Sequence, residues 1–152
     1  MKLIIKAALL AAAALSSATA ASAQEDLKVG AIYMDAQGFY AGVRKGIQDG
    51  AEEAGRNLVI VETNAQGDVS KESSFIDSLI SADVQAIIVS PVSADGSYRA
   101  IRRAHDAGIP VVCYNTCLNE QDMKEYISAY AVGDPYDFGH KLGDAAADYF
   151  IA

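Results

Sequence analysis

Five short apolar runs recur along the chain, and the segments between them carry apolar residues at helical spacing. The runs cover residues 27–34, 58–63, 86–90, 109–114 and 126–132. Near-continuous apolar strands that alternate with helices are typical of a parallel sheet covered on both faces. The sequence therefore predicts an α/β fold built on a doubly wound parallel sheet.

Cap and turn residues set the bounds of the expected helices. The first helix begins with the aromatic pair Phe39 and Tyr40 and ends before Gly55, which is placed as a C-cap. Asp68 or Ser70 caps the second helix. The third helix is expected over about residues 95–108, and the polar stretch NTCLNEQD that follows the fourth strand is expected to be a loop.

The last expected helix begins with Asp134 as its N-cap and Pro135 in its first position. One face of this helix holds Phe138, Leu142, Ala145 and Tyr149. Because the helix is still apolar and uncapped at Ala152, we expect the natural chain to continue into a further domain.

The first 23 residues have the pattern of a signal peptide. Two lysines flank the start of an apolar run at residues 7–15, and small residues at 21–23 suit a signal peptidase. A membrane anchor is the alternative, but the run is shorter than the ~20 residues that span a bilayer. We expect cleavage after Ala23, export of the mature chain, and one folded lobe formed by residues 24–152.

The charge of the chain argues against a nucleic-acid partner. There are 20 Asp and Glu residues against 12 Lys and Arg residues, which gives a formal net charge of -8. The basic residues are scattered and form no stripe, and such a surface repels a phosphate backbone.

The two cysteines, Cys113 and Cys117, leave a disulfide open. An oxidising compartment favours pairing. However, four residues of extended chain span about 13 Å, whereas the Cα atoms of a disulfide lie within about 7 Å. Pairing therefore requires a tight reversal at Asn115 and Thr116. No metal site is expected, because two thiols without a nearby His lack the ligands of tetrahedral zinc.

Polar and aromatic residues follow several of the expected strands. The carboxyl ends of parallel strands meet at one edge of the sheet, where ligands bind in such folds. A hydroxyl-rich ligand needs fixed donors and acceptors together with flat apolar surfaces. The candidates for the polar contacts are Gln37, Ser90, Asn115 and Thr116, and those for the apolar surfaces are Phe39 and Tyr40.

Structural roles remain open for these candidates. Phe39 and Tyr40 are also placed to be core residues of the first helix, with one of them pointing inward and the other toward the ligand. Ser90, which precedes Pro91, also suits the end of a strand, and Asn115 suits a turn.

Catalytic motifs do not appear in the sequence. There is no G-x-S-x-G elbow, no P-loop and no G-x-G-x-x-G after the first strand, and neither His105 nor His140 is paired with a nucleophile pattern. We expect no enzyme activity and no cofactor.

Three longer runs are distinctive in combination: VGAIYMDAQGFYAGVRKGIQDGAEEAGRNLVIVETNAQGD, AIIVSPVSAD and AGIPVVCYNT. Together they resemble the Rossmann-like amino-terminal lobe of type I periplasmic sugar-binding proteins of ABC importers, of the ribose- and galactose-binding type. The resemblance covers about residues 27–152. It implies a chain truncated before its second lobe.

The resemblance implies ligand contacts at the six candidates: a polar contact at Gln37, aromatic stacking at Phe39 and Tyr40, and polar contacts at Ser90, Asn115 and Thr116. Ribose-type members carry Asp-Arg in place of Asn115 and Thr116, and often Asn in place of Ser90. This departure argues against ribose and leaves another pentose, a hexose or a sugar alcohol open.

Further expectations concern partners. Family members close two lobes on the sugar and deliver it to a membrane permease, so the resemblance implies a permease partner and a monomer at full length. A sensor that feeds a chemoreceptor or histidine kinase is the alternative. A sugar-responsive transcription regulator is disfavoured because the signal peptide stands where its DNA-binding segment lies.

Overall fold

The computed structural model describes residues 26–36, 38–55 and 57–151. The predicted signal peptide and the candidate Gln37 lie outside these ranges. The elements, in chain order, are β1 Leu27–Tyr33, α1 Phe39–Glu53, β2 Leu58–Asn64, α2 Val69–Ser81, β3 Ala86–Val89, α3 Tyr98–Asp106, β4 Val111–Tyr114, α4 Glu120–Tyr126, β5 Ala129–Ala131 and α5 Pro135–Ile151.

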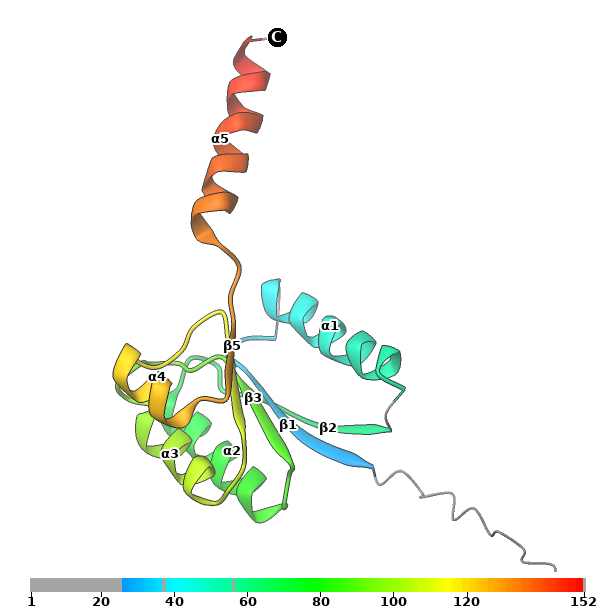
Figure 1. Cartoon of the computed structure of the whole chain (residues 1–152), viewed down its shortest axis with the longest axis vertical. Coiled ribbons are helices and arrows are strands. Elements are labelled where there is room, and N and C mark those ends of the chain that lie inside the picture. The colour runs from blue at the N-terminus through cyan, green and yellow to red at the C-terminus, as the bar shows by residue number, and fades with distance from the viewer. Residues whose placement is uncertain (1–25, 37, 56, 152) are drawn as a thin grey trace, which may run out of the picture.

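The five strands form one parallel sheet in the order β2-β1-β3-β4-β5. The predicted α/β fold is confirmed. Helix α1 lies on one face of the sheet, whereas α2, α3 and α4 lie on the other (Figure 1). The strand order reverses between β1 and β3, and the carboxyl edge beside such a reversal is where ligands bind in open α/β sheets.

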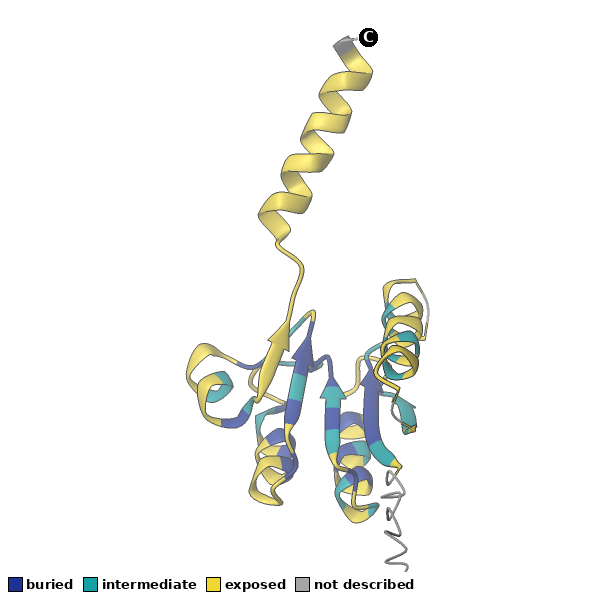
Figure 2. Cartoon of the chain, turned by 45° about the vertical axis from the view of Figure 1, so that its right-hand side comes forward, coloured by how far each residue is buried: buried dark blue, intermediate teal, exposed yellow. Residues whose placement is uncertain are grey.

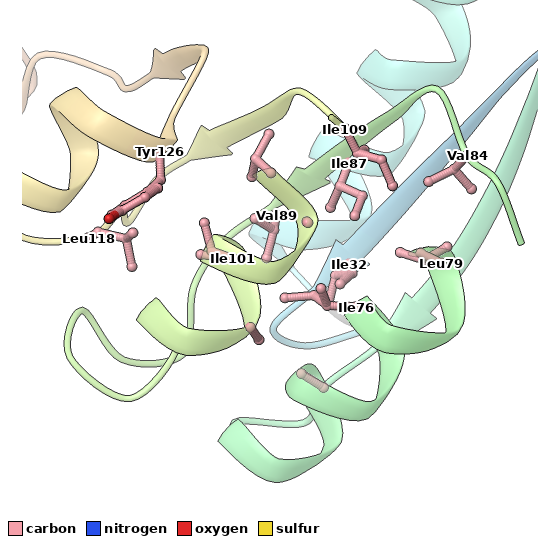
Figure 3. Close-up of a cluster of buried hydrophobic side chains, with 14 residues drawn as sticks. Ile32, Ile76, Leu79, Val84, Ile87, Val89, Ile101, Ile109, Leu118 and Tyr126 are labelled. Carbon is pink, nitrogen blue, oxygen red and sulfur yellow. The ribbon is translucent and has the colours of Figure 1, made fainter. Parts of the chain in front are cut away.

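The main core lies between the sheet and the α2–α3 layer. Ile32, Ile87 and Val89 of the strands pack against Ile76 and Ile101 of the helices, and all five are fully buried (Figure 3). Strand residues that alternate with these face α1 and form a second, smaller cluster with Tyr33 and Tyr114 at its centre. The sheet is therefore packed on both faces, although unequally.

Helix α1 covers its face of the sheet loosely. The spacing predicted a buried face over Tyr40, Val43, Ile47, Gly50 and Ala54, yet no residue of α1 is buried. Tyr40, Val43 and Ile47 are half-buried, whereas Gly50 and Ala54 are exposed. Figure 2 shows α1 in the colours of exposed and intermediate residues. Because α1 is the single helix that the described residues place on this face, the layer seals only part of the sheet.

The segment after β4 corrects two expectations. Residues 120–126 form α4, where a loop and the start of a strand were expected. Asn119 caps this helix, since its side chain accepts a hydrogen bond from the Asp122 amide at 3.0 Å. Tyr126 is buried as the last residue of α4 and does not begin β5, which covers only Ala129–Ala131.

Other element bounds are close to those expected. Asp68 caps α2 by accepting hydrogen bonds from the amides of Ser70 and Lys71. Asp134 accepts from the Tyr136 amide at 2.9 Å, so the predicted cap of α5 is confirmed. Helix α3 is shorter than predicted, because residues 93–97 form a hydrogen-bonded turn before it.

Helix α5 extends away from the sheet (Figure 1). Its predicted apolar face is exposed: Phe138 is 64% exposed, Leu142 56% and Tyr149 80%. No helix within the described ranges is long and apolar enough to cross a membrane.

Candidate ligand-binding site

The carboxyl edge of the sheet brings together residues of α1, residues that follow β3 and β4, and one residue of β5. Phe39 and Tyr40 open α1 directly after the loop that follows β1. Ser90 follows β3, and Asn115 and Thr116 follow β4. The described candidates Phe39, Tyr40, Ser90, Asn115 and Thr116, together with Tyr130 of β5, are called the edge site below.

The two aromatic residues of α1 have different surroundings. Phe39 is 58% exposed, whereas Tyr40 is half-buried and packs edge-on against Tyr114 with ring centroids 6.2 Å apart. The rings of Phe39 and Tyr40 also meet edge-on at 5.3 Å. The structure divides the pair: Tyr40 packs against the smaller core, and Phe39 stays exposed at the edge of the sheet. Their contacts with a ligand stay predictions.

Asn115 lies at the centre of a hydrogen-bonded group. Its amide nitrogen Nδ2 donates to the Tyr40 hydroxyl at 3.4 Å, and its backbone carbonyl accepts from the Tyr130 hydroxyl at 2.9 Å. Its backbone amide donates to the Ala131 carbonyl at 3.1 Å. The side chain is exposed, and its Oδ1 takes no hydrogen bond from a described residue.

Ser90 and Thr116 lie deeper. Ser90 is only 1% exposed, and its hydroxyl lies 2.9 Å from that of Thr116. Thr116 Oγ1 also donates to the Pro91 carbonyl at 2.9 Å. Ser90 thus lies at the end of β3 and supports Thr116, and its contact with the ligand stays a prediction.

Cys113 and Cys117 form a disulfide with their Cα atoms 5.5 Å apart. The reversal that pairing required is present at Asn115, whose φ of 59° is left-handed. This pairing, which the sequence left open, closes a covalent ring around the segment that carries two candidate ligand contacts.

Two cavities flank the edge site. One of about 500 Å³ has mostly apolar walls and is lined by Phe39 and Asn115 together with Ile88, Val112 and Tyr114. The other, of about 660 Å³, lies between α1 and β2 and is lined by Tyr40 with polar residues that include Arg44 and Glu62. The aromatic pair thus separates an apolar cavity from a polar one.

The polar cavity contains a linked group of side chains. Arg44 Nε donates to Glu62 Oε1 at 2.8 Å, and the Tyr33 hydroxyl donates to the same oxygen at 3.2 Å. The hydrogen bond from Arg44 lowers the pKa of the Glu62 carboxyl. Burial, reinforced by the charge of Glu62, raises the pKa of Tyr33 to about 12. Glu62 is therefore ionised and Tyr33 protonated at neutral pH.

The edge site itself is neutral. None of its six side chains carries a charge, and burial raises the pKa of Tyr114 beneath it, so that hydroxyl also stays protonated. Neutral hydroxyl and amide groups donate and accept hydrogen bonds without favouring an ionic ligand. Among the described residues, no group of three or more His, Cys, Asp or Glu side chains is placed to hold a metal ion.

Glu72 of α2 supports the segment that follows β3, and this role was not predicted from the sequence. It is fully buried, and its Oε2 accepts a hydrogen bond from the Val92 amide at 2.8 Å. Burial raises the pKa of its carboxyl, although hydrogen bonds from Ser97 and Val92 oppose the shift. The sequence contained a signal for the burial of this carboxyl, because Glu72 lies on the same helical face as Ile76 and Leu79.

Tyr130 was also missed. It is 40% exposed and holds the backbone of Asn115 through its hydroxyl. Alternation along the run YISAYAV predicts that Tyr130 lies on one face of the sheet. The position of Tyr130 beside Asn115 depends on where β5 ends, and the sequence does not show that end.

A parallel α/β lobe with a neutral, aromatic and polar cluster at its carboxyl edge is typical of small-molecule binding lobes. Residues 30–151 match the periplasmic binding protein domain family, and the chain belongs to that family.

Comparisons with individual known proteins point to the same family. The chain is 57% identical over 145 residues to the ABC transporter periplasmic-binding protein YphF of Escherichia coli K12. The matched region covers 95% of this chain and 44% of YphF. The chain thus spans less than half the length of that relative.

Two solved structures share the fold. One, from Mycobacterium smegmatis in complex with β-D-fucofuranose, is 27% identical, with a TM-score of 0.67 over 82% of this chain and 40% of that chain. The other is the fructose-binding periplasmic domain of a hybrid two-component system, at 18% identity, with a TM-score of 0.67 over 82% of this chain and 40% of that chain.

Proposed function

We propose that this chain is the first lobe of a substrate-binding protein of an ABC importer, which binds a monosaccharide or sugar alcohol in the periplasm and delivers it to a membrane permease. The observation that carries the proposal is the neutral edge site at the strand-order reversal, in a chain of the periplasmic binding protein family. The same proposal includes cleavage of a signal peptide after Ala23. It also includes that the protein binds its ligand without converting it to a product.

The candidate residues have different roles in this proposal. The exposed ring of Phe39 offers a flat surface to the C–H side of a sugar ring, and Asn115 Oδ1 and Nδ2 accept from and donate to hydroxyls. Thr116 contributes a hydroxyl held in place by Ser90, and Gln37 contributes a further amide. Because no edge-site side chain is charged, a neutral polyol fits better than a sugar acid or sugar phosphate.

Ribose-type proteins use a charged pair in place of Asn115 and Thr116, so we expect a ligand other than ribose. The name of YphF supports a transport role, and the fucofuranose complex supports a sugar as ligand.

Native mass spectrometry of the full-length exported protein tests the proposal. We expect a monomer that carries an adduct with the mass of a sugar or polyol. Calorimetry against a panel of D-ribose, D-xylose, D-fructose and xylitol then identifies the class, with ribose expected to bind most weakly. An acidic or phosphorylated adduct, or measurable turnover of any panel member, would contradict the proposal.

A matched pair of variants connects binding to the edge site. Phe39→Ala removes the exposed ring, and Val59→Ala removes a side chain that is 46% exposed on β2, away from the edge site. We expect only the first to weaken binding. Equal affinities for the two variants would contradict the assigned role of Phe39.

A sensor function is the second candidate, because the fructose-binding neighbour with the same fold belongs to a two-component system. The two functions differ in the partner and not in the ligand. Sugar-dependent stimulation of ATP hydrolysis by a reconstituted ABC permease would favour transport. Sugar-dependent activation of a histidine kinase or chemoreceptor, without stimulation of a permease, would favour sensing.

A further inference from the structure

The disulfide encloses two residues of the edge site. Cys113 is the third residue of β4 and is fully buried, and Cys117 follows Thr116. The bond between them closes a ring of the chain that contains Tyr114, Asn115 and Thr116. A covalent bond therefore spans the segment that carries the polar contacts proposed for the ligand.

The enclosed segment has a backbone conformation that few residues adopt. Asn115 has φ of 59°, in the left-handed region where non-glycine residues are uncommon. Thr116 N–H donates back to the Tyr114 carbonyl at 2.6 Å, and the two residues form an isolated antiparallel bridge. Such a reversal persists where the surrounding structure over-determines it.

The reversal sets the direction of the Asn115 and Thr116 side chains. It brings the Thr116 hydroxyl to the Ser90 hydroxyl and the Pro91 carbonyl, each at 2.9 Å. It also places the Asn115 side chain beside Tyr40, on the exposed surface of the edge site. A fully extended chain from Cys113 to Cys117 would span about 13 Å and would lack this reversal.

We propose that the Cys113–Cys117 disulfide positions the edge site: it holds Asn115 and Thr116 in their binding arrangement before the ligand arrives. The inference rests on the proposed function and adds the residues that pre-organise its polar contacts. Binding then spends less free energy on ordering these two side chains. The thiol form of the protein has the same contact residues without the covalent constraint, so its affinity is lower.

Reduction of the bond is a balanced two-electron step. A dithiol such as dithiothreitol attacks one sulfur, the S–S bond breaks, and two electrons and two protons convert the cysteines to thiols. The reductant leaves as its cyclic disulfide. Reduction removes no atom from the site, so its effect isolates the constraint from the packing.

The first measurement needs no ligand. Amide hydrogen exchange of the full-length protein is compared before and after reduction, with the thiol content verified by mass. We expect exchange at Asn115 and Thr116 to accelerate by about tenfold or more, with exchange in α2 and α3 unchanged. Unchanged exchange at Asn115 and Thr116 would overturn the inference, whatever the protein binds.

The second measurement is the affinity for the panel of D-ribose, D-xylose, D-fructose and xylitol. We expect reduction, or the double variant Cys113→Ala with Cys117→Ala, to weaken binding of the tightest panel member by about tenfold. Ile109→Val is the matched control, because it removes a single buried heavy atom before β4, away from the edge site. Its affinity should equal that of the unmodified protein.

The two measurements separate the possible failures. Equal affinities of oxidised and reduced protein would overturn the inference while the proposed function stands. Failure of the oxidised protein to bind any sugar or polyol would contradict the proposed function, and the exchange measurement would still decide whether the disulfide orders Asn115 and Thr116. A loss of affinity as large in Ile109→Val would show general destabilisation and also overturn the inference.

Discussion

The hydroxyl oxygens of Ser90 and Thr116 lie 2.9 Å apart, beneath the carboxyl edge of the sheet. Thr116 Oγ1 donates its proton to the Pro91 carbonyl, so Ser90 is the donor in the pair. This short chain of hydrogen bonds ties the end of β3 to the reversal after β4. Ser90 thus supports Thr116 through this hydrogen bond, and the predicted contact of Ser90 with the ligand stays a prediction.

Thr116→Val should destabilise the protein by about 1–3 kcal/mol, because it leaves the buried Ser90 hydroxyl and the Pro91 carbonyl without their partner. Ser90→Ala should cost less, since Thr116 keeps its bond to Pro91. Urea unfolding of the two single variants and the double variant measures the coupling. We expect the double variant to cost less than the sum, and strict additivity would show that the two hydroxyls do not interact.

Phe39→Ala should change the free energy of unfolding by no more than about 0.5 kcal/mol, because the side chain is 58% exposed. The same variant should weaken sugar binding by about 1 kcal/mol or more, because it removes an aromatic contact surface. Thermal unfolding and calorimetry on the same preparation separate the two effects. A large loss of stability would instead place Phe39 in the core.

Gly30→Ala should destabilise the protein by about 1–3 kcal/mol, because the added Cβ would overlap the Leu79 side chain of α2. Gly42→Ala is the matched control. The Cβ of that variant meets nothing within 4 Å inside α1, so we expect a gain of about 0.5–1 kcal/mol from the lower flexibility of the unfolded chain. Chemical denaturation of both variants checks the opposite signs.

Glu72→Gln should make the protein less sensitive to pH. Burial raises the pKa of the Glu72 carboxyl above its ordinary value of 4.5, so the folded state binds its proton more tightly than the unfolded state. The stabilisation from this group is complete below pH 4.5 and is lost as the pH rises through the folded-state pKa.

Glutamine keeps an acceptor for the Val92 amide and carries no charge. The variant should therefore gain stability relative to the unmodified protein between pH 4 and pH 7, as measured by urea unfolding at the two values. Glu53→Gln, an exposed change on α1, is the control for the removal of one carboxylate from the surface. A difference between variant and parent that is the same at both pH values would contradict the role of burial.

Much of the fold was predictable from local patterns. The apolar runs located β1 to β4, and Asp68 and Asp134 correctly marked two helix starts, because strand cores and caps depend on neighbouring residues. Helix α4 was missed because seven mostly polar residues show little periodicity. The one local signal for this helix was Asn119, a residue type that caps helices, which lies three residues before Asp122 and accepts a hydrogen bond from its amide.

The site was predictable in composition but not in detail. Fold class alone placed Phe39, Asn115 and Thr116 at one edge, because parallel strands end together. The burial of Ser90 and the support from Glu72 depend on long-range packing across β3 and α2, which no local pattern encodes. The disulfide likewise required the left-handed backbone of Asn115, which the residue type permits but does not demand.

The strand order has a consequence for folding. β1 pairs with β3 only after the intervening chain has returned across the sheet, as in the contact of Lys28 with Gln85, which are 57 residues apart. Contacts between distant parts of the chain form slowly, because loop closure must precede them. Phe39, Ser90 and Asn115 meet only when β1, β3 and β4 are all assembled, so competence to bind a ligand should be among the last properties that a newly synthesised chain acquires.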